Sequence, residues 1–385
     1  MKRTFAIFGG KVMNRKKYLC KVVIVAWAFL GAFAGIGMAQ WTPRGPLSRS
    51  AHTAVLDTTS GRMIVFGGFT TSVDSPPATH FNDVWYLNAA TNPSVTSSWT
   101  KAKPTGSAPS ARAGHSAIYN PASNRMVVFG GSAGYAAPCN NELWILENAN
   151  GVGAVPTWVQ VTPAGTPPSA RGGHRAVYNP ANNTMIVFGG NDCFSTYFND
   201  TWILKNADGT TGTPTWSFLT VGVPFGRIGH VQAYDPTTNR MIIFGGANQT
   251  TFFNDAWVLI NADGTGGLAQ WVGLTPTGAP CAREVPSGFY DPVTNRLVIF
   301  GGYCTAPMND TWVLTDANGN SGSSWCTDCG TWIPVSSGGT TPLGRFGHTA
   351  VFNPSKNRMT IFGGEVQANG LSTDTVSVLS GATSD

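Results

Sequence analysis

The sequence repeats one pattern six times, and this repetition is the feature that most constrains the fold. In most copies Arg-x-Gly-His opens the pattern and an apolar segment ending in Phe-Gly-Gly follows. A near-constant period indicates a repeat architecture in which each copy forms one structural unit. The second glycines of the pairs lie 56 to 63 residues apart, at Gly68, Gly131, Gly190, Gly246, Gly302 and Gly364.

Each copy predicts four β-strands, termed a to d below. Strand a alternates in character, as in residues 115–119, whereas strand b is a continuous apolar run such as 126–129, which suits burial on both faces. Strand c resembles 144–146, and strand d carries a further tryptophan such as Trp158. Abundant Gly and Pro with only 11% charged residues favour short strands and tight turns over helices. A four-stranded sheet with two apolar faces is unstable alone, so we expect neighbouring units to stack face to face.

The phase of the repeats indicates how the array closes. Trp41 precedes the first strand a, whereas the sixth copy stops at residues 378–379 with no tryptophan after it. Residues 41–43 are therefore predicted to supply strand d of the last unit, which leaves no open sheet edge. The tryptophans assigned to strand d are Trp41, Trp99, Trp158, Trp216, Trp271 and Trp332.

The glycine pair after strand b and the tryptophan in strand d resemble the kelch repeat family, over about residues 41 to 379. The resemblance implies an all-β, six-bladed β-propeller with four antiparallel strands per blade, here closed by the N-terminal outer strand. It implies little about chemistry, since kelch propellers include both binding modules and enzymes. The period exceeds the ~50 residues typical of the family, and the excess lies in long b–c and c–d loops.

The N-terminal region has the order of features of a secretory signal peptide. Residues 15–21 hold four basic side chains, residues 22–38 are apolar, and small residues precede Gln40. An apolar run of 17 residues with several glycines lies at the lower limit for a membrane span. Cleavage is therefore expected, with no stable membrane insertion afterwards.

The predicted organisation follows from this cleavage. Residues 1–39 form the signal peptide, with Met13 as a possible true start, and residues 40–385 form a single propeller. The localisation expected is secreted or periplasmic. Seven of the 24 Lys and Arg residues lie in the leader, which leaves 17 basic against 19 acidic residues. This balance removes the electrostatic argument for nucleic-acid binding.

The candidate binding site is the face formed by the d–a and b–c loops, where kelch proteins commonly bind partners. Six arginines stand where strand d passes into strand a, and around a ring they would surround the mouth of the channel. Guanidinium groups suit carboxylates and sulfates, so an acidic ligand is one interpretation. The alternative, favoured for most of the six, is that each arginine holds loop carbonyls or an aspartate of a neighbouring blade. The candidates are Arg49, Arg112, Arg171, Arg227, Arg283 and Arg345, together with Glu284, near which blade five departs from the pattern.

Other repeated polar residues are interpreted as structural. Histidines three residues after these arginines are expected to pack at the base of strand a, because equivalent ring positions do not converge on a metal. Blade five has Pro286 instead. Asn-Asp pairs before strand c are expected to cap turns or to pair with arginines of strand b. The loops 206–209 and 261–264 lack the ligands of a calcium loop and are predicted to be turns. The histidines are His52, His115, His174, His230 and His348.

Six cysteines follow the leader, and an even number in an exported chain indicates disulfides. No βαβ pattern surrounds the C-x-x-C motif, so a local bridge is favoured over a redox site. The pairs expected from the loops are Cys139–Cys193 and Cys281–Cys304 on the d–a/b–c face, and Cys326–Cys329 on the opposite face.

Two functions remain open. The first is an exported, non-catalytic binding or scaffold propeller that recognises a protein or a glycan as a monomer and needs no cofactor or metal. The second is a carbohydrate-active enzyme of the kelch type, similar to sialic-acid mutarotases or, less closely, to galactose oxidase. Residues that differ between blades are where such an activity would be sought: Glu142, Glu284, Tyr135, Tyr197 and Tyr303.

Overall fold

The computed structural model describes residues 45–70, 78–92, 97–134, 137–220, 222–321, 324–328, 330–336, 338–366 and 371–383. These residues belong to the compact unit Pro43–Asp385, and the predicted signal peptide lies outside them. Among the described residues no helix is both long and apolar enough to cross a membrane.

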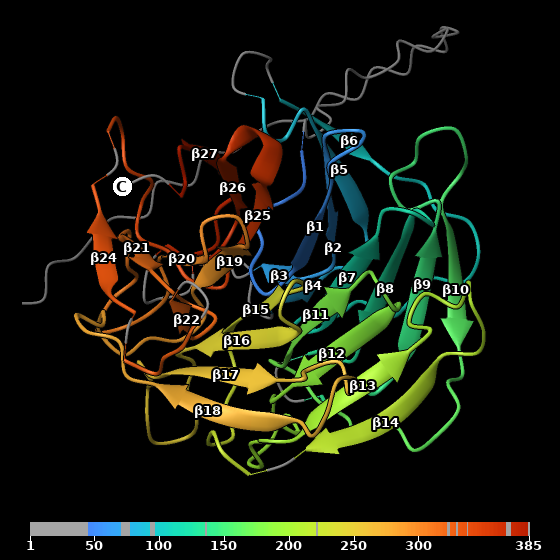
Figure 1. The fold of residues 1–385 in the computed structure, drawn as a ribbon. Helices are drawn as coiled ribbons and strands as arrows, with labels where there is room; N and C mark the ends of the chain where they lie inside the picture. The colour runs from blue at the N-terminus through green and yellow to red at the C-terminus, as the bar shows by residue number, and fades with distance from the viewer. Residues whose placement is uncertain are drawn as a thin grey trace, which may run out of the picture. The chain divides into compact units, whose positions relative to one another are not determined.

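The described chain folds into six antiparallel blades, five with their strands in the order a–b–c–d and the sixth with strands a–b–c. Figure 1 shows the blades following one another around a ring, with the last strands beside the first. The blades are β1 (Thr53–Asp57), β2 (Arg62–Phe66), β5 (Val84–Asn88), β6 (Ser98–Lys101); β7 (Ser116–Asn120), β8 (Arg125–Phe129), β9 (Leu143–Glu147), β10 (Thr157–Val161); β11 (Arg175–Asn179), β12 (Thr184–Phe188), β13 (Thr201–Lys205), β14 (Thr215–Thr220); β15 (Val231–Asp235), β16 (Arg240–Phe244), β17 (Ala256–Ile260), β18 (Gln270–Leu274); β19 (Ser287–Asp291), β20 (Arg296–Phe300), β21 (Thr311–Leu314), β24 (Trp332–Val335); and β25 (Thr349–Asn353), β26 (Arg358–Phe362), β27 (Val376–Ser380).

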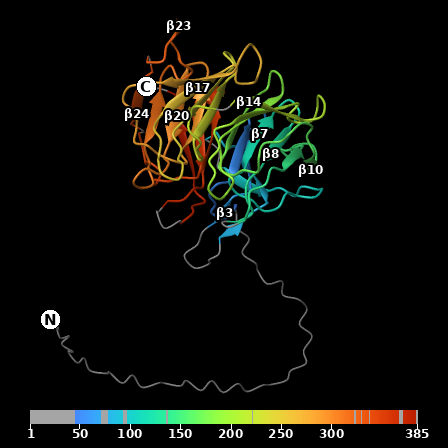
Figure 2. The same cartoon turned by 90° about the horizontal axis from the view of Figure 1, so that it is seen from below.

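Small elements extend three of the loops. The b–c loop of blade one carries the hairpin β3 (Phe69–Thr70) and β4 (Thr79–His80), and the c–d loop of blade five carries β22 (Asn320–Ser321) and β23 (Ser324–Trp325). The 3-10 helix η1 (Pro354–Lys356) lies in the a–b loop of blade six. Figure 2 shows β3 and β23 at opposite ends of the view, as expected for b–c and c–d loops on opposite faces.

The hydrophobic core is divided into six clusters, each between two adjacent blades. In the cluster between blades one and two, Phe66 of strand b packs against Trp158 of the next blade, with ring centroids 4.9 Å apart. The same pair recurs between blade six and blade one as Phe362 and Trp99, at 4.7 Å. The predicted face-to-face stacking is therefore confirmed, and it includes the contact that joins the end of the array to its beginning.

Ring closure also has a polar component. The strand β25 packs against β1, and Arg358 donates a hydrogen bond to the Thr91 carbonyl oxygen across the same junction, at 2.9 Å. Among the described residues blade six has three strands. The fourth, predicted for residues 41–43, lies outside them and stays a prediction.

The glycine pair is required because two blades meet at the end of strand b. A Cβ atom on Gly67 would lie 2.8 Å from the ring of His115 in the next blade. A Cβ atom on Gly68 would lie 2.7 Å from Cβ of His52 in its own blade. Both glycines also have φ values in the left-handed region, which L side chains rarely adopt.

Candidate functional site

The six candidate arginines lie inside the blades rather than at the channel surface. Arg171 is fully buried, and its Nη atoms donate to both carboxylate oxygens of Asp200 at 2.7 and 2.9 Å. It also donates to the Gly189 and Ser169 carbonyl oxygens and stacks over the Phe198 ring. Four of its five N–H groups thus donate to protein atoms. The arginine holds loop carbonyls, as the alternative interpretation predicts, but its aspartate belongs to the same blade and not to a neighbouring one.

The remaining five arginines have the same position. Each is buried and donates to the carbonyl oxygen of the first glycine in its own Gly-Gly pair. Packing places them beneath the loops with almost no exposure to solvent, and their part in ligand binding stays a prediction. Their side-chain partners are Asp83 for Arg49, Glu142 for Arg112, Asp255 for Arg227, Asp310 for Arg283 and Thr375 for Arg345.

The predicted pairing of the Asn-Asp aspartates with strand-b arginines is wrong. Strand c runs antiparallel to strand b, so the residue before strand c lies at the end of strand b. The strand-b arginine lies at its start, roughly 14 Å away at 3.4 Å per residue. Arg62 instead donates to the Asn150 carbonyl oxygen in the next blade, at 2.7 Å. Glu142 takes the place of the aspartate in blade two, so it is not a blade-specific acid.

The five histidines form contacts between blades. Each is buried, and its ring packs edge-on against the strand-b phenylalanine of the preceding blade. Four of them place Nε2 within 2.9 Å of a strand-a hydroxyl of that preceding blade, as His174 does with Ser116. Burial, followed by the charge of neighbouring arginines, lowers the pKa values of all five, to about 3 for His115, His230 and His348. The rings are therefore neutral at physiological pH.

A cavity of about 170 Å³ lies on the axis, walled by the strand-a residues of all six blades. Its lining is hydroxyls, imidazoles, one glutamine and small apolar groups, with one exception. Arg175 of blade three also lines it. Its Nε donates to the His230 carbonyl oxygen at 3.1 Å, and within the described chain no carboxylate forms an ion pair with it. Burial lowers the pKa of Arg175, although the group stays protonated.

Sequence reasoning missed Arg175. The signal was the residue that directly follows the histidine, or Pro286 in blade five, in each copy. That residue is Thr53, Ser116, Arg175, Val231, Ser287 and Thr349 in order. Only an alignment of the six copies against one another singles out one charged member.

A ring of backbone hydrogen bonds surrounds the axis next to this cavity. The residue before each histidine, or before Pro286, donates its N–H to the carbonyl oxygen of its counterpart in the preceding blade, at 2.7 to 3.1 Å. All six have φ between 49 and 67°, which explains why four are glycines. Val285 is a β-branched exception in this strained region. The ring consists of Ala51, Gly114, Gly173, Gly229, Val285 and Gly347.

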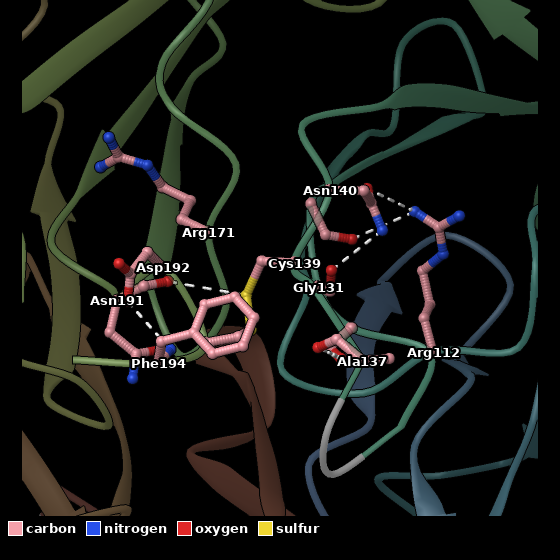
Figure 3. The surroundings of a disulfide bond; sticks show 12 residues. Arg112, Gly131, Ala137, Cys139, Asn140, Arg171, Asn191, Asp192 and Phe194 are labelled. Atoms are coloured by element: carbon pink, nitrogen blue, oxygen red, sulfur yellow. Dashed lines mark hydrogen bonds between the residues drawn. A yellow bond between two sulfur atoms is a disulfide. The ribbon is translucent and has the colours of Figure 1, made fainter. Parts of the chain in front are cut away.

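The d–a/b–c face carries the disulfide that the sequence predicts. Cys139 and Cys193 join the b–c loops of blades two and three, with Cα atoms 5.5 Å apart. Beside the bridge, one Asp192 carboxylate oxygen accepts the backbone N–H groups of Phe194, Ser195 and Thr196 at 2.9 to 3.0 Å. Figure 3 shows Phe194 on this fixed loop. Its side chain is 67% exposed, so the loop presents an aromatic ring to solvent.

Further apolar side chains are exposed on the same face. Phe225 of the d–a loop is 74% exposed and stacks on Phe253, which in turn covers Arg227. Phe252 contacts Tyr303, at 6.2 Å between ring centroids. Three of the four strongly exposed phenylalanines in the described chain therefore lie on this face.

Two acidic side chains on this face are each specific to one blade. Glu284 and Glu365 follow one another in blades five and six, and burial raises the pKa of both carboxyl groups. Their backbones bridge those of Tyr303 and Phe346, whose rings contact each other at 5.3 Å. The pKa of Tyr197 is also raised, by burial and then by the charge of Glu284. Of the other blade-specific candidates, Tyr135 lies outside the described residues.

The other cysteine predictions have different outcomes. Cys281 and Cys304 are free thiols in this structure. They are neighbours, because burial and then a hydrogen bond with Cys304 raise the pKa of Cys281. Arg283 also donates to the Cys281 sulfur at 3.3 Å. The bond between them stays a prediction. The Cys326–Cys329 pair does too, since residue 329 lies outside the described chain.

The loops considered for calcium form turns that join blades. Asp208 accepts hydrogen bonds from Asn120 and Ser123 of the preceding blade at 2.7 Å, and Asp263 is bonded in the same way. Burial raises the pKa of Asp208, but these and further hydrogen bonds outweigh it and lower the value to about 2. Its oxygens are occupied by the fold. Among the described residues no group of three or more metal-ligating side chains is present.

These features define a repeat β-propeller whose recurring polar residues hold the blades together. The model of the KLHDC2/KLHL20/DRC7 Kelch-repeats domain matches residues 1–154 and 154–320. The chain therefore belongs to the kelch-repeat family, as its glycine pairs and tryptophans indicate.

Relatives among known proteins agree with this membership. The chain is 32% identical over 238 residues to tip elongation aberrant protein 1 of Schizosaccharomyces pombe, covering 59% of this chain and 19% of that protein. It is 30% identical to Kelch domain-containing protein 3 of Rattus norvegicus, covering 57% and 56% of the two chains. It is also 27% identical to human host cell factor 2, over 70% of this chain and 33% of the relative. The chain thus spans less than two thirds of each of these relatives.

The solved structure of YjhT has a similar fold. The match has a TM-score of 0.61 at 14% identity and covers 88% of this chain and 99% of that one. At this identity the likeness supports the propeller architecture alone.

Proposed function

We propose that this protein is an exported, non-catalytic binding propeller that recognises a protein partner through its d–a/b–c face. The observation that carries the proposal is the set of exposed phenylalanines on fixed loops of that face. The repeated polar residues are in contrast occupied by contacts within and between blades.

Exposed aromatic side chains of this kind are typical anchors of protein interfaces. Trp, Tyr and other large rings in well-packed positions contribute most of the binding energy at such surfaces. Phe194 is held by the Cys139–Cys193 bridge and by three hydrogen bonds to Asp192. A loop fixed before binding loses little entropy when a partner docks, which favours affinity.

The disulfide on the d–a/b–c face also supports the proposed export. A disulfide between loops persists in oxidising compartments and is rare in the cytosol. The predicted leader of residues 1–39 provides the route, and residues 40–385 are proposed to form one exported, monomeric propeller.

The alternative function, a carbohydrate-active enzyme, is favoured by one feature. Glu284 and Glu365 are carboxyl groups with raised pKa values beside the aromatic pair of Tyr303 and Phe346. Buried carboxyl groups with raised pKa values suit acid–base chemistry, and aromatic rings suit the apolar faces of sugars.

The test compares variants of the disulfide-intact protein on the two faces. Immobilised protein is exposed to secreted proteins of its source, and the affinity of each captured protein is then measured. Phe225→Asp is expected to weaken a true partner at least tenfold. Leu268→Asp is the matched control, because Leu268 is 93% exposed on the opposite face.

Two outcomes contradict the proposal. If Phe225→Asp and Leu268→Asp bind the captured partner with equal affinity, the d–a/b–c face is not the interface. If neutral or acidic sugars raise the melting temperature of the wild type and Glu284→Gln abolishes the effect, the carbohydrate-active alternative is favoured instead.

A further inference from the structure

We infer that the cavity on the propeller axis is a binding site for a small oxyanion, with Arg175 as its cationic group. This inference concerns the channel and does not depend on what the d–a/b–c face binds. Its ligand is defined by chemistry: at least two oxygens on one centre that share a negative charge, as in phosphate, sulfate or a short carboxylate.

The charge of Arg175 is not balanced by the fold. The six arginines that begin the repeats differ from Arg175. Each donates to loop oxygens, and five of the six have a carboxylate partner. Within the described chain Arg175 makes one hydrogen bond, from Nε to the His230 carbonyl oxygen. A guanidinium placed in a partly dry cavity without a counter-ion is costly, which favours an anion beside it.

The position of Arg175 suits a ligand on the axis. Its charge lowers the pKa values of histidines in blades two, three, four and six, after the larger effect of burial. The positive charge of the guanidinium thus acts on histidines of several blades around the propeller axis. Arginine presents a planar fork of donors that matches two oxygens of an oxyanion.

The neighbouring hydroxyls supply further donors. In His52, His174 and His348 the Nδ1 atom is buried and has no partner within the described chain. An orphaned lone pair is less costly than an orphaned N–H, so the proton lies on Nε2. Each Nε2–H then donates to its hydroxyl partner, Thr349, Ser116 or Ser287. The hydroxyl hydrogens are left to point into the cavity, whose wall these residues form.

The cavity has the right size for such a ligand. A volume of about 170 Å³ holds several water molecules or one small anion with some of its hydration. Among its lining residues there is no carboxylate that would repel an anion.

The test is a thermal-shift and calorimetric titration of the full, disulfide-intact protein with millimolar phosphate, sulfate and acetate, against chloride at equal ionic strength. The wild type is expected to melt at a higher temperature with at least one of the three, and the anion that acts identifies the ligand class. Arg175→Thr is the informative variant, because threonine stands at the equivalent position in blades one and six. It is expected to fold and to bind that anion at least tenfold more weakly.

A control variant separates a site from a general salt effect. Sulfate and phosphate stabilise many proteins by exclusion from the surface, and such an effect persists in Arg175→Thr. Arg125→Thr removes one positive charge outside the cavity and is expected to keep the wild-type response. The inference is overturned if none of the three anions shifts the wild type, or if Arg175→Thr responds as the wild type does.

Discussion

Arg171 and Arg175 are four residues apart in blade three, yet their surroundings are opposite. Arg171 is fully buried with a bidentate aspartate, a glycine carbonyl oxygen and an aromatic ring around it. Arg175 faces a cavity and, among the described residues, has one hydrogen-bond partner, a backbone carbonyl oxygen. Each of the other five blades has an arginine equivalent to Arg171, whereas none has one equivalent to Arg175. The comparison teaches that repeated residues in this propeller build the ring, whereas residues unique to one blade are where binding is to be sought.

The largest expected effect is the loss of folding stability at acidic pH that the repeated histidines cause. Their folded-state pKa values lie below that of an exposed histidine, so the unfolded chain takes up protons first and stability falls as the pH drops below about 6.5. His115, His230 and His348, with pKa values of about 3, alone remove about 8 kcal/mol between pH 6.5 and 4.5, at about 1.4 kcal/mol per pH unit each.

Urea unfolding at a series of pH values measures this effect. The slope of unfolding free energy against pH gives the protons taken up, and His348→Gln is expected to lower it by about one. A stability that stays flat down to pH 4.5 would show that the rings are not held neutral.

The next effect concerns the buried ion pairs. Asp200→Ala removes the partner of Arg171 and leaves a buried charge, which costs about 3–5 kcal/mol. Glu147→Ala, which breaks the partly exposed pair with Arg125, is expected to cost no more than about 1 kcal/mol. Chemical denaturation compares the two variants, and similar losses would remove the distinction between buried and surface pairs.

A comparable effect is expected from Trp41. If residues 41–43 form the fourth strand of blade six, Trp41 packs as Trp99 and Trp158 do, and Trp41→Ala costs about 3 kcal/mol. Denaturation of the processed protein measures this loss. A variant as stable as the wild type would mean that blade six closes without that strand.

A smaller effect is expected from the disulfide. Cys139→Ser with Cys193→Ser opens a loop of 54 residues and is expected to cost about 2–4 kcal/mol. Partner binding should weaken as well, because the loop of Phe194 loses its support. Unchanged binding in a destabilised variant would separate the bridge from the interface. Thiol counting on the protein purified without reductant tests whether Cys281 and Cys304 also pair.

The fold was predictable because its signals lie within each repeat. The apolar run 126–129 and the glycine pair after it place strand b, and the loops of Cys139 and Cys193 place both on one face. The strand-b arginines are not the partners of the aspartates, because the antiparallel register of strands b and c places the two groups at opposite ends of strand b. Arg175 was missed, since its neighbours on the axis come from five other blades.

The most direct measurement is the unfolding free energy of Arg171→Thr and Arg175→Thr, side by side in a buffer free of oxyanions. The account predicts opposite results. Arg171→Thr loses several kcal/mol because it strips loop carbonyls and Asp200 of their donor, whereas Arg175→Thr is as stable as the wild type or more so. If Arg175→Thr is destabilised as strongly as Arg171→Thr, Arg175 is one more structural arginine and the distinction fails.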